Sequence, residues 1–226
     1  MNVSSTLRIP LLLLAALAGS CAGLPEWESG PVASEPPPIS PETGEIQRLL
    51  AEGGRFVVGK TELVIRGRRF RMDCTGTVLA IYWYAGIDLA RDFHKFSGGG
   101  VARIYRSLEE KGLLYSNPRP LTGDIIFWDD TYDRNGDGLW NDRLTHVGMV
   151  LESREDGVIE FVHLNYSDGI VVEYMDLFEP DIEKKLVDGE LRIMNSPIRI
   201  KNPWRPHPPR WLAGQLYRVL GMGYLF

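Results

Sequence analysis

The spacing of apolar residues changes near residue 120 and predicts helices before that point and strands after it. Apolar side chains recur at helical spacing from Pro41 to Ala51, and we expect this helix to end at Gly53-Gly54. The segment Cys74 to Ala85 is dense in apolar residues, which favours a buried helix opening after Asp73. Gly100 to Lys111 has one apolar face and predicts another helix.

After Pro120 the segments are short, rich in β-branched and aromatic residues, and bounded by Gly, Asp and Asn, as is typical of strands. We also expect a strand and turn from Lys60 to Phe70. The later strands are expected at 124–128, 146–151, 158–165 and 170–174, with one or two more within 186–200. Helices followed by a run of antiparallel strands predict an α+β fold with one domain.

The two ends of the chain differ from this central part. Residues 1–20 have a weakly basic start, an apolar run and small residues, which indicate a secretory signal peptide. Small residues directly before Cys21 indicate cleavage and lipid attachment there, with plain cleavage as the alternative. Residues 21–44 read as a lipid-anchored, Pro-rich linker. The segment 201–226 is a Pro-rich and aromatic tail, either a terminal helix packed on the domain or a membrane-surface contact.

Composition and charge limit the classes of function that the protein could have. The chain has 226 residues, of which 44% are hydrophobic and 24% charged, and these values suit a globular protein with a core. A net charge of −5 and the absence of a basic stripe argue against nucleic acid as a partner. The basic run Arg66 to Arg71 is short, and we interpret it as a solvated strand edge rather than a phosphate site.

The two cysteines suggest where the chemistry lies. If Cys21 is lipidated or removed, Cys74 has no partner within the chain, and a lone exported thiol is either buried as a small hydrophobe or used. Cys74 stands at the start of a predicted helix, where the helix dipole and free N–H groups favour the thiolate and can stabilise an oxyanion. We therefore expect Cys74 to be partly or wholly ionised near neutral pH, and Gly76 and Gly148 to leave access for a substrate. The alternative for Gly76 is the close approach of a neighbouring strand.

A thiol nucleophile needs a base, and the chain has four histidines. His94 lies in a polar loop and His207 among prolines, so neither is a candidate. His146 heads a predicted strand and shares a face with Gly148, which would leave space for a thiol. His163 lies on the next strand, so a hairpin would make the two histidines neighbours, one as base and the other orienting it.

Four short motifs follow one another along the chain and include the candidate residues. They are Asp73-Cys74-Thr75-Gly76, Gly123-Asp124-Ile125-Ile126-Phe127-Trp128, Thr145-His146-Val147-Gly148-Met149-Val150, and Val162-His163. Together they resemble the NlpC family of cell-wall cysteine peptidases, to which the CHAP amidases are related. The resemblance covers about residues 45–174, within an NlpC-like catalytic domain expected at 45–200.

This resemblance implies a papain-like fold, in which the Cys-bearing helix packs on an antiparallel β-sheet. It implies a cysteine hydrolase of the bacterial envelope that cleaves amide bonds in peptidoglycan stem peptides. By position, Cys74 would be the nucleophile, His146 the base and His163 the orienting residue, and Asp73 would help hold the substrate amine. The chemistry requires no cofactor. With the lipid anchor at Cys21, we expect an outer-membrane lipoprotein facing the periplasm.

The chain departs from the family pattern before the cysteine. Where an aromatic residue and a Gly-Gly pair are usual, it has Val57-Val58-Gly59-Lys60 and no tyrosine. That difference bears on the substrate pocket and keeps two alternatives open. One is a non-catalytic module that binds peptidoglycan, and the other is a Cys-dependent acyltransferase on the same fold.

A separate acidic pattern lies in the long connection before His146. Asp133, Asn135 and Asp137 alternate and are followed by Gly138, as at the start of a calcium-binding loop. The twelfth position is Leu144, where such loops carry a Glu, so a solvated acidic loop is the alternative. We predict one structural calcium ion that orders the loop leading into His146.

Overall fold

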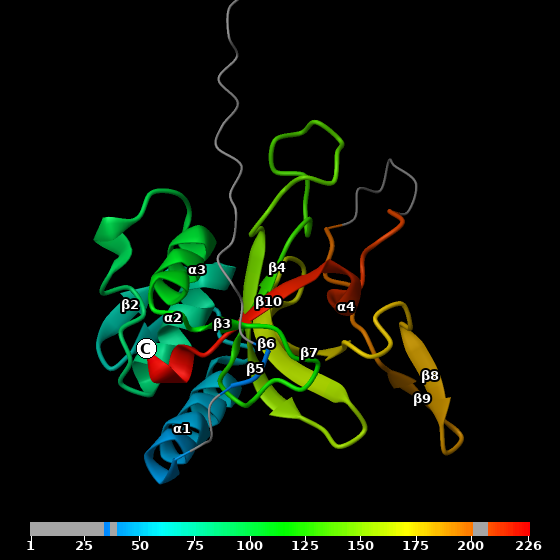
Figure 1. Ribbon diagram of the computed structural model, residues 1–226, viewed down its shortest axis with the longest axis horizontal. Coiled ribbons are helices and arrows are strands. Elements are labelled where there is room, and N and C mark those ends of the chain that lie inside the picture. The colour runs from blue at the N-terminus through cyan, green and yellow to red at the C-terminus, as the bar shows by residue number, and fades with distance from the viewer. Residues whose placement is uncertain (1–33, 37–39, 201–207) are drawn as a thin grey trace, which may run out of the picture.

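A six-stranded antiparallel sheet occupies the centre of the computed structural model, with three helices grouped beside it (Figure 1). The structure describes residues 34–36, 40–200 and 208–226. Across the sheet the strands are β3 (Leu114–Tyr115), β10 (Tyr217–Gly221), β4 (Ile125–Trp128), β5 (His146–Ser153), β6 (Val158–Asn165) and β7 (Gly169–Asp176). The predicted α+β class and antiparallel sheet are confirmed.

Helix α2 (Cys74–Tyr84) is buried within the domain, as its apolar sequence predicts. It contacts strands β5 and β6 and helix α1 (Pro41–Val57). Helix α3 (Gly100–Glu110) buries the apolar face that its spacing predicted. Because α2 is held on the sheet by apolar contacts, its first residue has a fixed position relative to β5 and β6.

Helix α1 extends beyond the predicted end and runs through Gly53 and Gly54 to Val57. A Cβ atom on Gly54 would lie 2.5 Å from Leu151 Cδ2, and one on Gly53 would lie 3.0 Å from Tyr84. The prediction that Gly53-Gly54 ends the helix is therefore wrong. These glycines allow α1 to pack closely against α2 and the sheet.

The basic run lies on a hairpin formed by β1 (Leu63–Ile65) and β2 (Arg68–Phe70), with a turn at Arg66-Gly67. Its arginines make ion pairs that are partly or largely exposed: Arg68 with Asp88, Arg69 with Glu62 and Arg71 with Asp73. These paired side chains agree with the interpretation of a solvated strand edge.

The C-terminal segment is part of the sheet rather than a tail. Residues 208–226 include α4 (Ala213–Leu216), strand β10, and a final turn, η2 (Gly223–Leu225). Strand β10 lies between β3 and β4, and Leu220 is fully buried. Both interpretations of this segment, a terminal helix and a membrane-surface contact, are corrected here, because the segment adds a strand to the sheet and its apolar side chains are buried in the core.

A second hairpin, β8 (Lys184–Val187) with β9 (Glu190–Ile193), stands away from the central sheet (Figure 1). It accounts for the extra strands expected within 186–200, and the chain after it returns to the edge of the cavity described below. Among residues 34–36, 40–200 and 208–226, no helix is both long enough and apolar enough to cross a membrane.

Candidate active site

A cavity of about 530 Å³ opens where the start of α2 meets the start of β5 and the end of β6. Cys74, His146 and His163, the three residues predicted to carry the chemistry, all line it. Its other walls come from the β4–β5 connection, the β6–β7 turn and the segment after β9. They include Thr131, Tyr132, Asn165, Tyr166, Ser167, Asp168, Pro197, Ile198, Arg199 and Ile200.

Cys74 is the first residue of α2 and is half-buried at the cavity wall. The preceding residue, Asp73, caps the helix by accepting a hydrogen bond from the N–H of Gly76 at 2.7 Å. The backbone N–H groups of Thr75 and Val147 lie close enough to the sulfur to lower the pKa of the thiol. Since Val147 follows His146 directly, this contact brings the thiol against the strand that carries the proposed base.

The surroundings of Cys74 favour the neutral thiol, so the expected ionisation of Cys74 is wrong. Burial and the charge of Asp73 raise the pKa of the Cys74 thiol, and the N–H groups of Val147 and Thr75 offset this only in part. Burial, together with the neighbouring His163, holds the pKa of His146 well below its ordinary value. At neutral pH the site therefore holds a neutral thiol and a neutral imidazole, because the apolar surroundings outweigh the helix terminus.

The two histidines form a direct hydrogen bond, with His146 Nε2 2.7 Å from His163 Nδ1. The antiparallel register of β5 and β6 pairs Met149 with Val162, which places His163 opposite Gly148 and diagonal to His146. The expected hairpin neighbours are thus confirmed.

The glycines near the site have a different role from the one predicted. A Cβ atom on Gly148 would lie 3.1 Å from the Trp128 ring and 3.2 Å from His163 Cβ, so the small residue makes room for the Trp128 ring and for the Cβ of His163. A Cβ atom on Gly76 would lie 2.0 Å from the carbonyl oxygen of Arg71. Neither glycine leaves space for a thiol or a substrate, and both expectations are wrong.

Two further residues extend the histidine pair. His163 Nε2 lies 3.0 Å from Glu173 Oε2 on β7, and Asn165 donates to Glu173 Oε1 at 2.9 Å. Asn165 Oδ1 in turn accepts from the backbone N–H of Ser167 at 2.8 Å. Neither residue was predicted from the sequence. The signal for Glu173 was a Glu in the middle of a strand, on the same face of the sheet as Val171 and Met175.

The remaining motif residues have mainly structural contacts. Asp124 is fully buried and accepts hydrogen bonds from the backbone N–H of Leu121 and from the hydroxyl of Tyr115, which anchors the start of β4. Asp73 lines the cavity, and its second oxygen pairs with Arg71 Nε at 3.1 Å. His94 lies in the short turn η1 (Phe93–Lys95) and does not line the cavity. Cys21 and His207 lie outside the described residues.

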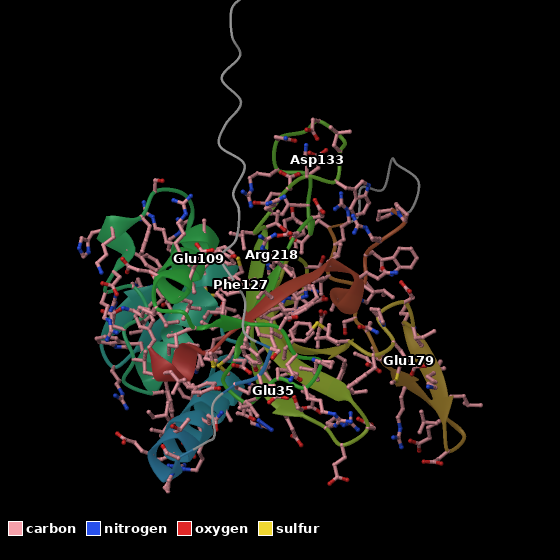
Figure 2. All side chains as sticks on the ribbon, viewed as in Figure 1. Glu35, Glu109, Phe127, Asp133, Glu179 and Arg218 are labelled. Carbon is pink, nitrogen blue, oxygen red and sulfur yellow. The ribbon has the colours of Figure 1, made fainter. Side chains whose placement is uncertain are left out.

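The predicted calcium residues lie in the β4–β5 connection, which projects from the sheet and carries the labelled Asp133 (Figure 2). The two Asp133 oxygens accept from the N–H groups of Gly136 and Gly138, and Asn141 donates to Asp137. Within the part of the chain that the structure describes, no group of three or more His, Cys, Asp or Glu side chains is arranged to hold a metal ion. Calcium at Asp133, Asn135 and Asp137 stays a prediction.

No protein-family model, curated protein or solved structure matches this chain. The resemblance to the NlpC family therefore rests on the four motifs and stands as a proposal.

The pKa of the thiol leads to a first prediction, on the reactivity of Cys74 in the free protein. Because the pKa is raised, the thiolate fraction is small at neutral pH and increases as the pH rises. Alkylation by iodoacetamide, followed by mass spectrometry, should accelerate continuously from about pH 6 to about pH 9. A rate that is already at its plateau at about pH 6 would show a preformed thiolate instead.

Proposed function

We propose that the protein is a cysteine hydrolase with a papain-like fold that cleaves amide bonds in peptidoglycan stem peptides. The observation that carries the proposal is the meeting of Cys74, at the start of α2, with the bonded pair His146 and His163 around one cavity. A nucleophile, a base and a group that orients the base are the three roles of a catalytic triad.

In the first half of the reaction, Cys74 Sγ attacks the carbonyl carbon of the amide and its proton passes to His146. Nε2 of His146 bonds to His163, so Nδ1 is the ring nitrogen left to receive the proton. The thiol and the imidazole both begin neutral, so proton transfer accompanies attack. The N–H group of Cys74 is the candidate oxyanion donor, because those of Gly76 and Thr77 are bonded to Asp73 and that of Thr75 serves the sulfur.

Collapse of this intermediate breaks the carbon–nitrogen bond, and the proton held by His146 Nδ1 moves to the departing amine. A thioester of Cys74 remains. His146 Nδ1 then takes a proton from a water molecule, whose oxygen attacks the thioester carbon. The carbon–sulfur bond then breaks, and His146 returns its proton to the sulfur. The product leaves as a carboxylic acid, which loses its remaining proton to the solvent, so that the enzyme is regenerated with one water consumed.

The two alternatives differ from this proposal at identifiable steps. A Cys-dependent acyltransferase would form the same thioester and pass it to an amine or a lipid in place of water. A non-catalytic peptidoglycan-binding module would need neither proton donor nor acceptor at the cavity. A histidine that is 1% exposed and bonded to both a second histidine and a carboxylate costs desolvation energy, and this favours a catalytic site over simple binding.

We also propose that the enzyme works in the bacterial envelope, as an outer-membrane lipoprotein anchored through Cys21 and facing the periplasm. The support is the sequence pattern of residues 1–44, a signal peptide followed by a linker of Pro-rich composition. A substrate built into the cell wall would be within reach of such an anchor.

The second prediction concerns hydrolysis itself. Purified peptidoglycan incubated with the protein should release peptide fragments, which mass spectrometry detects and assigns to a bond. Cys74→Ala and His146→Ala should each lower the rate by about 10²-fold or more, and His163→Ala should lower it less. His94→Ala is the matched control, since His94 lies away from the cavity, and should be unchanged. Equal activity of wild type and Cys74→Ala would refute the proposed nucleophile.

The third prediction concerns calcium at Asp133, Asn135 and Asp137. An ion that binds only the folded protein raises the free energy of unfolding by mass action. Each kcal/mol of added unfolding free energy raises Tm by about 2–4 °C in a chain of this size. Millimolar calcium added to chelator-treated protein should therefore raise Tm, and Asp137→Ala should remove the increase. Asp156→Ala, a carboxylate in a different turn, serves as control. An unchanged Tm in the wild type would exclude the ion.

A further inference from the structure

The hydrogen bonds beyond His163 form one continuous line from the backbone to the proposed base. The line runs from the Ser167 N–H through the Asn165 amide and the Glu173 carboxylate to His163, and then to His146. Each link is between 2.7 and 3.0 Å, within normal hydrogen-bond range. Because His163 is buried, each of its ring nitrogens needs a partner of the right kind.

In each of these hydrogen bonds, the neighbouring bond decides which atom donates and which accepts. The backbone N–H groups of Ser167 and Asp168 both donate to Asn165 Oδ1, so the Asn165 amide nitrogen must face Glu173. An ionised Glu173 can only accept hydrogen bonds, and one of its oxygens accepts from that N–H. The other oxygen must accept a hydrogen bond from His163, which places the hydrogen of neutral His163 on Nε2.

His163 Nδ1 is then an acceptor, and the 2.7 Å contact requires His146 to donate from Nε2. In a neutral imidazole the other nitrogen carries a lone pair, so His146 Nδ1 is ready to take a proton. We infer that Glu173 is a positioning residue which, with its orientation fixed by Asn165, sets the tautomer of His146 that can act as a base. This inference rests on the proposed function for its catalytic consequence, whereas the tautomers themselves can be measured without it.

Glu173→Gln exchanges the donor and the acceptor in the hydrogen bonds between residue 173 and His146, while keeping the size and shape of the side chain. Asn165 still presents an N–H, so the carbonyl of the new glutamine faces Asn165 and its amide nitrogen faces His163. His163 Nε2 becomes an acceptor, Nδ1 carries the hydrogen, and His146 Nε2 accepts. The hydrogen of His146 then sits on Nδ1, where the base must be free.

A second substitution restores the original direction. When Asn165→Asp is combined with Glu173→Gln, one oxygen of the new aspartate accepts from the Ser167 N–H and the other accepts from the amide nitrogen of the new glutamine. The glutamine carbonyl then faces His163 Nε2, as the Glu173 oxygen does in the wild type. Asn165→Asp alone brings two carboxyl groups together, which can share one proton and still leave an oxygen for His163.

The test measures four proteins: the wild type, both single variants and the double variant. Hydrolysis of peptidoglycan should fall about 10²- to 10⁴-fold in Glu173→Gln, the range for loss of a general base, and return to near the Asn165→Asp level in the double variant. Nitrogen NMR shifts of the histidine rings should report His146 protonated on Nε2 in every protein except Glu173→Gln, where they should report Nδ1. Equal melting temperatures would show that the fold is kept.

The outcomes separate the inference from the function. If Glu173→Gln keeps the wild-type tautomers and rate, or the double variant is no better than Glu173→Gln, the positioning role of Glu173 is overturned. If the tautomers change as expected but the wild type hydrolyses nothing, Glu173 does set the tautomer of His146, and the proposed function fails. A variant that simply lost structure would not be rescued by the second change, so rescue also excludes a purely structural role for Glu173.

Discussion

The hydrogen bond between His146 and His163 is the constraint on which the rest of the site depends. It exists because β5 and β6 pair in one register, with Gly148 leaving room for the Cβ of His163 beside the Trp128 ring. A shift of one residue would turn His163 to the other face of the sheet. The core that holds β5 between β4 and β6 therefore also holds the base in its place.

The same packing sets the charge state of the site. Helix α2 rests on β5 and β6, so Cys74 lies in surroundings that favour the neutral thiol, and the Asp73 cap adds a negative charge nearby. The cap that stabilises the helix start thus opposes ionisation of the residue that follows it. In the proposed reaction the thiol stays protonated until a substrate arrives, and His146 would remove the proton during the attack.

Sequence alone could predict the α+β class, the start of α2 at Cys74, and β6 to the residue, because each depends on local periodicity and capping. It could also predict that His146 and His163 are neighbours, since hairpin pairing is short-range. The end of α1 was missed because Gly53 and Gly54 serve contacts with Tyr84 and Leu151, which lie far away in sequence. Strand β10 was missed for a related reason, since its partners β3 and β4 precede it by about a hundred residues.

The site shows the same division between local and long-range information. Cys74, His146 and His163 stand in recognisable motifs, whereas Glu173 has meaning only once β7 is known to pair with β6. The ionisation of Cys74 was predicted in the wrong direction. The sequence reveals a helix N-terminus, but it does not reveal that the thiol is partly buried, and this burial raises its pKa.

The most direct test of the central claim is the solvent deuterium isotope effect on acylation of Cys74. The burst of p-nitrophenol from p-nitrophenyl acetate can be followed in H₂O and in D₂O at matched acidity, with Cys74→Ala as background. If His146 removes the thiol proton during attack, acylation should be slower in D₂O than in H₂O, and the difference should disappear in His146→Ala. Acylation that proceeds equally fast in both solvents would contradict the account, because the proton would already have left the sulfur.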